Sequence, residues 1–462
     1  MVNNITVKYA FIGIIFAFMF YAFSINHQLI ISNIKLIYKP TFYHGEHIHK
    51  NYFEGWYYKT VITNESLIII PGIYKSALPY DGKSHAFVMV IRDGYECLYY
   101  RYNISEFNSK GTDSSKFMIR IGQNKFSENE VVLSLPAIRL IQSTDIEYDE
   151  YTDLLVKDWS RIMGKGSESK SKIPSLKSSF TRPPFIPYSV RGYISFNDIT
   201  PYPFTYTHPN VMGIFAYIPF LECNHGIISM SHRSSGMVEF INMENNGIIE
   251  NRMDLESGFG YIEKDWGVNF PESWIWSQSN KFINEKEEKS SSILISIADI
   301  PLVSSDNPLL KIPYLKDFLH FPGRIIIFYH AKSNITYNFS TYNLFSKVID
   351  LVINMDENNP SMQYVQDVKL HVMDISNGLN LEINIKRKFG NGIPLRSPSK
   401  QFGKMALMIE ESLDAELHVK LWRSGKVSQE EEVIFNDHSI VSGLEIVGNV
   451  WWIVSKLSAG KV

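Results

Sequence analysis

YIEKDWGVNFPESWIWSQSN, residues Tyr261 to Asn280, places three tryptophans and three acidic residues within twenty positions. A second segment, FEGWYYK from Phe53 to Lys59, again sets a carboxylate among aromatic rings. Indole and phenol rings are large apolar bodies with one polar handle, so rings clustered around acids and lysines line an apolar cavity that holds charge at chosen places. The two segments predict a pocket for chemistry on an apolar substrate.

The same alternation has a simpler explanation. Tryptophans at alternating positions, such as Trp274 and Trp276, are also typical of a strand that covers a core, and carboxylates beside them are often solvated turn residues. The motif alone therefore does not distinguish a pocket wall from a strand that covers a core.

The composition indicates a globular protein with a sizeable core. Of the 462 residues, 45 % are apolar and 20 % are charged, and the length suits two or three domains or two large β domains. The formal net charge is -3 and no basic stripe is present, which argues against a nucleic-acid partner. Cys97 and Cys223 are the two cysteines, too few for a disulfide framework or a zinc ribbon.

The amino terminus predicts a membrane anchor. Tyr9 to Ile25, YAFIGIIFAFMFYAFSI, is uncharged and near the short end of a bilayer span, and no small-residue cleavage pattern follows it, so an uncleaved helix is favoured over a signal peptide. We therefore expect residues 1–37 to form a single-pass transmembrane helix and a tether. Glycosylation sequons favour a lumenal or extracellular body; they begin at Asn64, Asn103, Asn334 and Asn338.

The body of the chain predicts an all-β fold. Short runs rich in β-branched and aromatic residues are separated by Gly, Pro, Asn or Asp, and no alternation of strands with helices is found. We expect two consecutive antiparallel β-barrels or sandwiches, over residues 38–255 and 256–462, with the aromatic motif near their junction. A segment rich in Ser, Lys and Pro, about residues 164–187, is predicted to be a mobile loop.

The sequence lacks the common catalytic motifs. It has no nucleophile elbow, P-loop or dinucleotide fingerprint, and His44, His47 and His49 are interpreted as part of a polar loop, so neither a metal nor a cofactor is expected. Acid chemistry in an aromatic pocket remains: a desolvated carboxyl has a raised pKa and can donate a proton at neutral pH, while aromatic rings stabilise a cation. The carboxylates placed for this are Glu54, Glu263 and Asp265.

At these residues the chain resembles the tocopherol cyclase family. The family's E-K-N-W-G segment, followed by F-P and W-x-W, stands here as Glu263, Lys264, Asp265, Trp266, Gly267, Phe270, Pro271, Trp274 and Trp276. Its F-E-G-W-Y-x-K segment matches Phe53 to Lys59 in full, and its P-L-R-x-P segment matches Pro394 to Pro398. The resemblance covers roughly residues 38–449. This chain departs from the family in having Asp265 in place of Asn, and Glu272 and Ser273 in place of a basic pair.

The resemblance implies two calycin-like (lipocalin-like) barrels and an intramolecular cyclase that closes the chromanol ring of tocopherols, the vitamin E compounds, from a prenylated hydroquinone without a redox cofactor. Protonation of a prenyl double bond would give a tertiary cation that the phenol oxygen traps. We expect Glu263 or Asp265 as the proton donor, with Glu54 in support. The substrate-binding residues expected around them are Trp56, Tyr57, Lys59, Lys264, Trp266, Trp274 and Trp276.

Two other functions fit the same residues. A membrane-tethered calycin-type protein could bind a lipid or isoprenoid in this pocket and catalyse nothing, because a fold does not fix a function. Alternatively, the aromatic motif only holds the two halves of a scaffold together.

Overall fold

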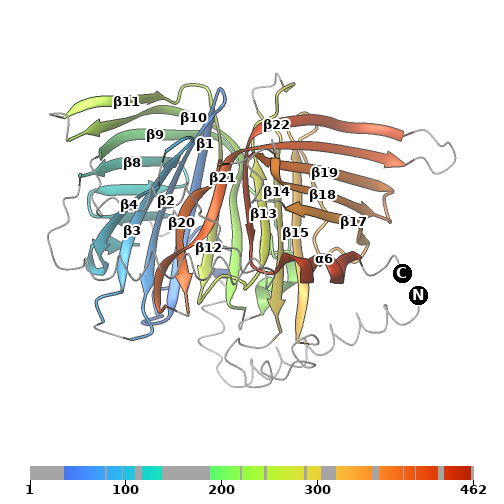
Figure 1. Cartoon of the computed structure of the whole chain (residues 1–462), viewed down its shortest axis with the longest axis horizontal. Helices are drawn as coiled ribbons and strands as arrows, with labels where there is room; N and C mark the ends of the chain where they lie inside the picture. The colour runs from blue at the N-terminus through green and yellow to red at the C-terminus, as the bar shows by residue number, and fades with distance from the viewer. Residues whose placement is uncertain are drawn as a thin grey trace, which may run out of the picture.

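The computed structural model describes residues 36–78, 81–95, 97–109, 117–137, 188–218, 221–243, 247–285, 289–302, 319–355, 364–388, 390–400, 402–424 and 431–458. These residues form two antiparallel β-sheets that lie side by side (Figure 1). The prediction of a mostly β, antiparallel protein is therefore confirmed.

The first sheet is a nearly closed barrel. Its strand order is β4-β3-β2-β1-β12-β10-β9-β8-β7-β6-β5, with β11 paired to β10. Asn124 donates a hydrogen bond to the Tyr102 hydroxyl (3.0 Å), which links β7 to β4 across the gap between the end strands. The elements are β1 (Tyr52–Ile62), β2 (Glu65–Lys75), β3 (His85–Arg92), β4 (Leu98–Asn103), η1 (Ile104–Glu106), β5 (Phe107–Asn108), β6 (Met118–Ile121), β7 (Asn124–Ser127), β8 (Glu130–Leu135), β9 (Tyr188–Thr200), η2 (Gly213–Tyr217), β10 (Cys223–Asn242), β11 (Ile248–Asp254) and β12 (Gly258–Gly267).

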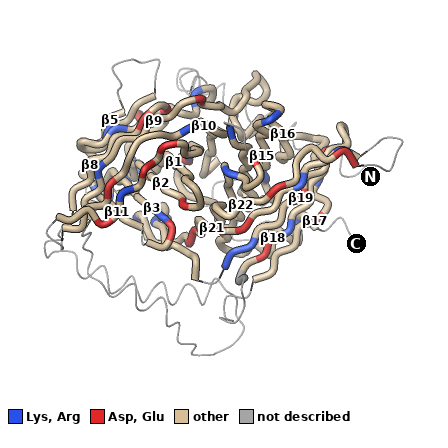
Figure 2. The backbone as a smooth tube through the Cα atoms, turned by 90° about the horizontal axis from the view of Figure 1, so that it is seen from above, with Lys and Arg blue, Asp and Glu red and all other residues tan. Residues whose placement is uncertain are grey.

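The second sheet has the order β16-β15-β14-β13-β22-β21-β19-β18-β17, with β20 paired to β21. Seen from above, the strands of the two sheets occupy the two halves of the molecule, and β21 lies between them, in contact with β2 (Figure 2). Its elements are β13 (Trp274–Ser279), β14 (Ser292–Pro301), β15 (His320–His330), β16 (Ile335–Asn338), β17 (Ser346–Met355), β18 (Tyr364–Asp374), β19 (Leu379–Lys388), β20 (Ile393–Ser399), β21 (Lys404–Ser424), β22 (Glu431–Val447) and α6 (Val450–Ser458).

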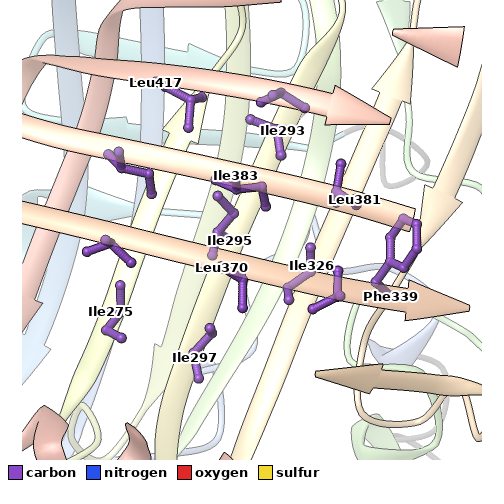
Figure 3. Packing of buried hydrophobic residues seen from close by; sticks show 14 of the residues in the cluster. Ile275, Ile293, Ile295, Ile297, Ile326, Phe339, Leu370, Leu381, Ile383 and Leu417 are labelled. Carbon is purple, nitrogen blue, oxygen red and sulfur yellow. The ribbon is translucent and has the colours of Figure 1, made fainter. Parts of the chain in front are cut away.

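Side-chain alternation gives each sheet an inner face and a face toward the other sheet. Successive residues of a strand point to opposite faces, and β-branched residues pack well on a pleated surface. In the second sheet, Ile275, Ile295 and Ile383 meet in an aliphatic core (Figure 3). Trp274 and Trp276, on either side of Ile275, instead join a third cluster between the sheets. We call this third cluster, with the polar side chains that face it, the intersheet layer.

The segment from Tyr261 to Asn280 crosses from one sheet to the other. Its first residues belong to β12 and its tryptophan pair to β13, so the chain changes sheets between Gly267 and Trp274. Gly267 has φ +150°, and a Cβ there would lie 2.1 Å from the carbonyl oxygen of Glu222, which only glycine avoids. The domain boundary expected after residue 255 falls before β12, whereas the strand pairing keeps β12 in the first sheet.

Two expectations concern residues outside the described ranges. The predicted anchor from Tyr9 to Ile25 and the predicted loop 164–187 both lie there. In the part of the chain that is described, no helix has the length and apolar character needed to cross a membrane. The anchor therefore stays a prediction.

Candidate active site

The two faces of β12 carry two separate sets of charged residues. Ile262 lies in the core of the first sheet, and Tyr261 lies in the intersheet layer. Because side chains alternate along a strand, Lys264 lies on the face of Ile262, and Glu263 and Asp265 lie on the face of Tyr261. The pairing of Glu54 with Trp266 and of Tyr57 with Glu263 extends the same division to β1.

On the inner face of the first sheet, Glu54 and Lys264 form a fully buried ion pair. Glu54 Oε1 lies 2.6 Å from Lys264 Nζ, and both side chains are 0 % exposed. Glu54 also accepts hydrogen bonds from the Tyr52 hydroxyl and from the backbone N–H groups of His44 (3.0 Å) and Gly45 (3.2 Å). Burial alone raises the pKa of Glu54, but Lys264 and His44 outweigh burial and lower it, so Glu54 is held as a carboxylate.

Aromatic rings enclose this pair. His44 stacks on Trp266 with ring centroids 4.3 Å apart, and its Nδ1 lies 2.7 Å from Lys264 Nζ. The Lys264 ammonium lies 5.0 Å from the Trp56 ring and 4.6 Å from the Trp266 ring. Burial lowers the pKa of Lys264 to about 8. These contacts fix β1, β12 and the preceding loop to one another.

On the opposite face, His225 bridges two carboxylates. Its Nδ1 lies 2.7 Å from Asp265 Oδ1 and its Nε2 lies 3.3 Å from Glu263 Oε2. The register of β10 against β12, which pairs His225 with Asp265, produces this contact. Tyr261 completes the group by donating a hydrogen bond of 2.6 Å to Glu263 Oε2. We call His225, Glu263 and Asp265 the His225 triad.

The charges of the triad decide its protonation. Burial disfavours the imidazolium, but Asp265 and Glu263 outweigh burial and raise the pKa of His225 to about 10. At neutral pH His225 is therefore held as an imidazolium between Asp265 and Glu263. The three side chains also offer ligand atoms within 4.8 Å of one another, so they could hold a divalent metal ion once His225 lost its proton.

A further carboxyl group faces the same layer from the second sheet. Tyr57 donates a hydrogen bond of 2.7 Å to Glu411 Oε1, and its ring packs edge-on against Trp276 with centroids 5.5 Å apart. Glu411 is 0 % exposed, and burial, with the charges of Glu263 and Asp93, raises its pKa to about 7. Trp274 Nε1 donates a hydrogen bond of 2.8 Å to Glu445.

Lys59 is a second buried cation of the layer. Its ammonium donates hydrogen bonds to the carbonyl oxygens of Val441 (2.8 Å) and Gln278 (3.3 Å), and thereby joins β1 to the second sheet. Burial lowers its pKa to about 8 against the opposing effect of Glu411.

The structure divides the predicted site residues into two groups. Tyr57, Lys59, Glu263, Asp265, Trp274 and Trp276 meet in the intersheet layer, whereas Glu54, Trp56, Lys264 and Trp266 lie on the inner face of the first sheet. Sequence reasoning missed His225, a single histidine outside any motif, and Glu411, which is 354 positions from the tyrosine that binds it. Neither has a local signal. An open surface depression on β8 and β9 contains none of these residues.

The family described as Tocopherol cyclase-like matches residues 189–448. The chain is 21 % identical over 422 residues to "Tocopherol cyclase, chloroplastic" of Zea mays, covering 89 % of this chain and 77 % of that protein. It is 21 % identical over 430 residues to "Probable tocopherol cyclase, chloroplastic" of Oryza sativa subsp. japonica, covering 89 % and 78 %.

Solved structures give weaker likenesses. The crystal structure of CghA has a TM-score of 0.43 at 7 % identity and covers 86 % of this chain and 89 % of its own. Kievitone hydratase from Nectria haematococca has a TM-score of 0.37 at 11 % identity with the same coverage.

Proposed function

The chain belongs to the tocopherol cyclase-like family, as its motifs predict, and we propose that it catalyses the acid-promoted ring closure of a prenylated hydroquinone to a chromanol. One observation carries this proposal. The intersheet layer brings the His225 triad, Tyr57 and Glu411 together with two buried tryptophans from the other sheet. Groups that can donate or accept protons thus lie beside apolar and aromatic side chains.

The reaction makes two proton transfers and no redox change. A proton adds to the less substituted carbon of the prenyl double bond, and the electron pair of that bond forms the new C–H bond. The hydroquinone oxygen then attacks the resulting tertiary cation, and its own proton passes to a base. Substrate and product are isomers, so no electron acceptor is consumed.

The His225 triad suits this chemistry. Two carboxylates around one imidazolium leave excess negative charge, which favours a cation beside them, and Trp274 and Trp276 add the attraction of their ring faces. We assign acceptance of the hydroquinone proton to Glu263, with Tyr261 orienting Glu263 and Asp265 holding His225 beside it. Tyr57 and Lys59 belong to the same wall.

Glu54 supports the site from behind. Its ion pair with Lys264, enclosed by Trp56 and Trp266, fixes the strand that carries Glu263, and this is a positioning role. The apolar part of the intersheet layer is the place we assign to the prenyl chain of the lipid substrate. The predicted anchor from Tyr9 to Ile25 would hold the body of the protein beside the membrane that contains such a lipid.

The test is turnover of a synthetic prenylated hydroquinone by the full chain under anaerobic conditions, with chromanol measured by mass spectrometry. Glu263→Gln should lower the rate by about 100-fold or more, as expected for loss of a proton-transfer group. Glu256→Gln is the matched control, because Glu256 is exposed in the turn before β12 and should keep wild-type activity. Absence of chromanol from the wild type would refute the proposal.

A binding protein is the second candidate. The same buried aromatic layer, and the Asp265 that replaces the family's Asn, favour retention of a lipid or isoprenoid without reaction. Recovery of one unaltered lipid per chain from the purified protein, together with no turnover of the hydroquinone, is the result that this candidate predicts.

A further inference from the structure

Glu411 on β21 is a buried carboxyl group outside the His225 triad, and no role has yet been assigned to it. It is 0 % exposed, its Oε1 accepts the Tyr57 hydrogen bond of 2.7 Å, and its Oε2 has no hydrogen-bond partner among the described residues. Gln278 is also 0 % exposed, and neither its amide nitrogen nor its amide oxygen has a hydrogen-bond partner among the described residues. Buried polar atoms are nearly always satisfied, so such a group of exceptions indicates a place for a ligand or for chemistry.

A glycine in the backbone beside Glu411 allows close packing in this part of the layer. Gly443 pairs with Gln278 across β13 and β22. A Cβ at Gly443 would lie 2.7 Å from a ring carbon of Trp276 and 3.2 Å from Glu411 Oε1. Glycine at this position therefore lets the tryptophan ring and the carboxyl group occupy the same part of the layer.

Tyr57 connects the His225 triad on the first sheet with Glu411 on the second. Tyr57 pairs directly with Glu263 across β1 and β12, and directly opposed residues have Cβ atoms about 4.5–5.5 Å apart. The hydroxyl of the same tyrosine reaches Glu411. A substrate bound against Tyr57 would thus have one carboxyl group on each sheet.

We propose that Glu411 is the acid that protonates the prenyl double bond, and that Glu263 is the base that accepts the hydroquinone proton. This inference rests on the proposed cyclase function and names the two partners of its proton transfers. The O–H bond of Glu411 breaks as the C–H bond forms. The C–O bond then forms as the substrate O–H bond breaks toward Glu263, and the active site returns to its starting charge when one proton passes back to Glu411.

The protonation of Glu411 and the neighbours of Glu263 support these roles. Burial raises the pKa of Glu411 to about 7, so a large fraction of this carboxyl group holds a proton at neutral pH. Glu263, in contrast, faces the imidazolium of His225, which keeps its own proton because its pKa is raised to about 10. The titratable groups that act on Glu411 come from three strands and one turn: Tyr57 and Lys59 on β1, Glu263 on β12, Glu445 on β22, and Asp93 after β3.

The experiment compares wild type, Glu411→Gln and Glu416→Gln in single turnovers of the prenylated hydroquinone. Glu411→Gln keeps the shape of the side chain and removes the proton, so chromanol formation should fall by about 100-fold or more. Binding of the substrate, followed by tryptophan fluorescence, should change little. Glu416→Gln lies on the same strand at a part-exposed position and should behave as wild type.

A second variant keeps the test valid if Glu411→Gln does not fold. The Tyr57 hydrogen bond lowers the pKa of Glu411, so Tyr57→Phe should move the loss of activity on the alkaline side to higher pH. In the wild type that loss should occur as the pH rises through about 7.

The outcomes distinguish failure of the proposed function from failure of the role of Glu411. No chromanol from the wild type overturns the proposed function, and the role of Glu411 falls with it. Chromanol from both wild type and Glu411→Gln at similar rates, or a pH profile unmoved by Tyr57→Phe, overturns the role of Glu411 alone.

Discussion

Replacing Asp265 by asparagine, the residue that the family usually has here, tests the electrostatics of the His225 triad directly. Asp265 Oδ1 lies 2.7 Å from His225 Nδ1, and after burial it is the largest influence on the pKa of that imidazole. Asn keeps the shape and can still accept a hydrogen bond from the ring, so the substitution removes mainly the charge.

The expected magnitude follows from the position of the two groups. The pKa of His225 is raised from 6.5 to about 10, which corresponds to a preference for the charged form on the order of 5 kcal/mol. A carboxylate in contact changes a neighbour's pKa by about one to three pH units. Since the Asp265 side chain is 27 % exposed, water screens part of its attraction, and we expect a fall of roughly one to two pH units in Asp265→Asn.

The assay is an NMR titration of protein containing isotope-labelled histidine, with His225 assigned by its loss in His225→Gln. Because the folded pKa of His225 lies above the ordinary value, its stabilising charge is fully present below pH 6.5 and is lost as the pH rises through about 10. Asp265→Asn should move this loss to lower pH. Asp299→Asn is the control, since it removes the charge from a similar contact of 2.8 Å to His320 elsewhere. An unchanged His225 titration in Asp265→Asn would show that Asp265 does not hold its proton.

Two further predictions concern stability. Lys264→Met leaves the buried carboxylate of Glu54 without its partner and should lower the free energy of unfolding by about 3–5 kcal/mol in urea denaturation. Lys369, whose side chain is 56 % exposed, provides the control: Lys369→Met should change the free energy of unfolding little, and equal losses in both variants would contradict this account. Gly443→Val places side-chain atoms against Trp276 and should destabilise the protein by about 1–3 kcal/mol, measured by thermal melting with tryptophan fluorescence. An unchanged melting temperature would mean that the layer accommodates the added side chain without strain.

The sequence predicts the strands well because their signal is local. Runs such as Ser66 to Tyr74 and His85 to Arg92 carry β-branched and aromatic residues between turn signals, and both form strands, β2 and β3. The division of Glu263 and Lys264 onto opposite faces also follows from alternation along one strand. The family assignment depends on such local patterns, and it is confirmed.

The position of Glu54 relative to the segment from Tyr261 to Asn280 could not be predicted from the sequence in the same way. Whether Glu54 shares a face with Glu263 depends on the register between β1 and β12, and a slip of one residue would turn every side chain of β1 to the other face. The observed register pairs Glu54 with Trp266 and so places it with Lys264. His225 and Glu411 reach the site only through pairing of strands that are distant in sequence.

The buried charges of this protein show why one motif serves both fold and chemistry. Glu54 has a cation and several donors around it, so its charge is fully compensated and ties two strands together. Glu411 is as deeply buried but keeps one oxygen without a hydrogen-bond partner in the described part of the chain, and burial raises its pKa. A buried carboxyl group with an oxygen that lacks a hydrogen bond lowers the stability of the fold. Strand alternation lets neighbouring residues of β12 contribute to each arrangement: Lys264 compensates Glu54 inside the first sheet, and Glu263 faces the intersheet layer, where it raises the pKa of Glu411.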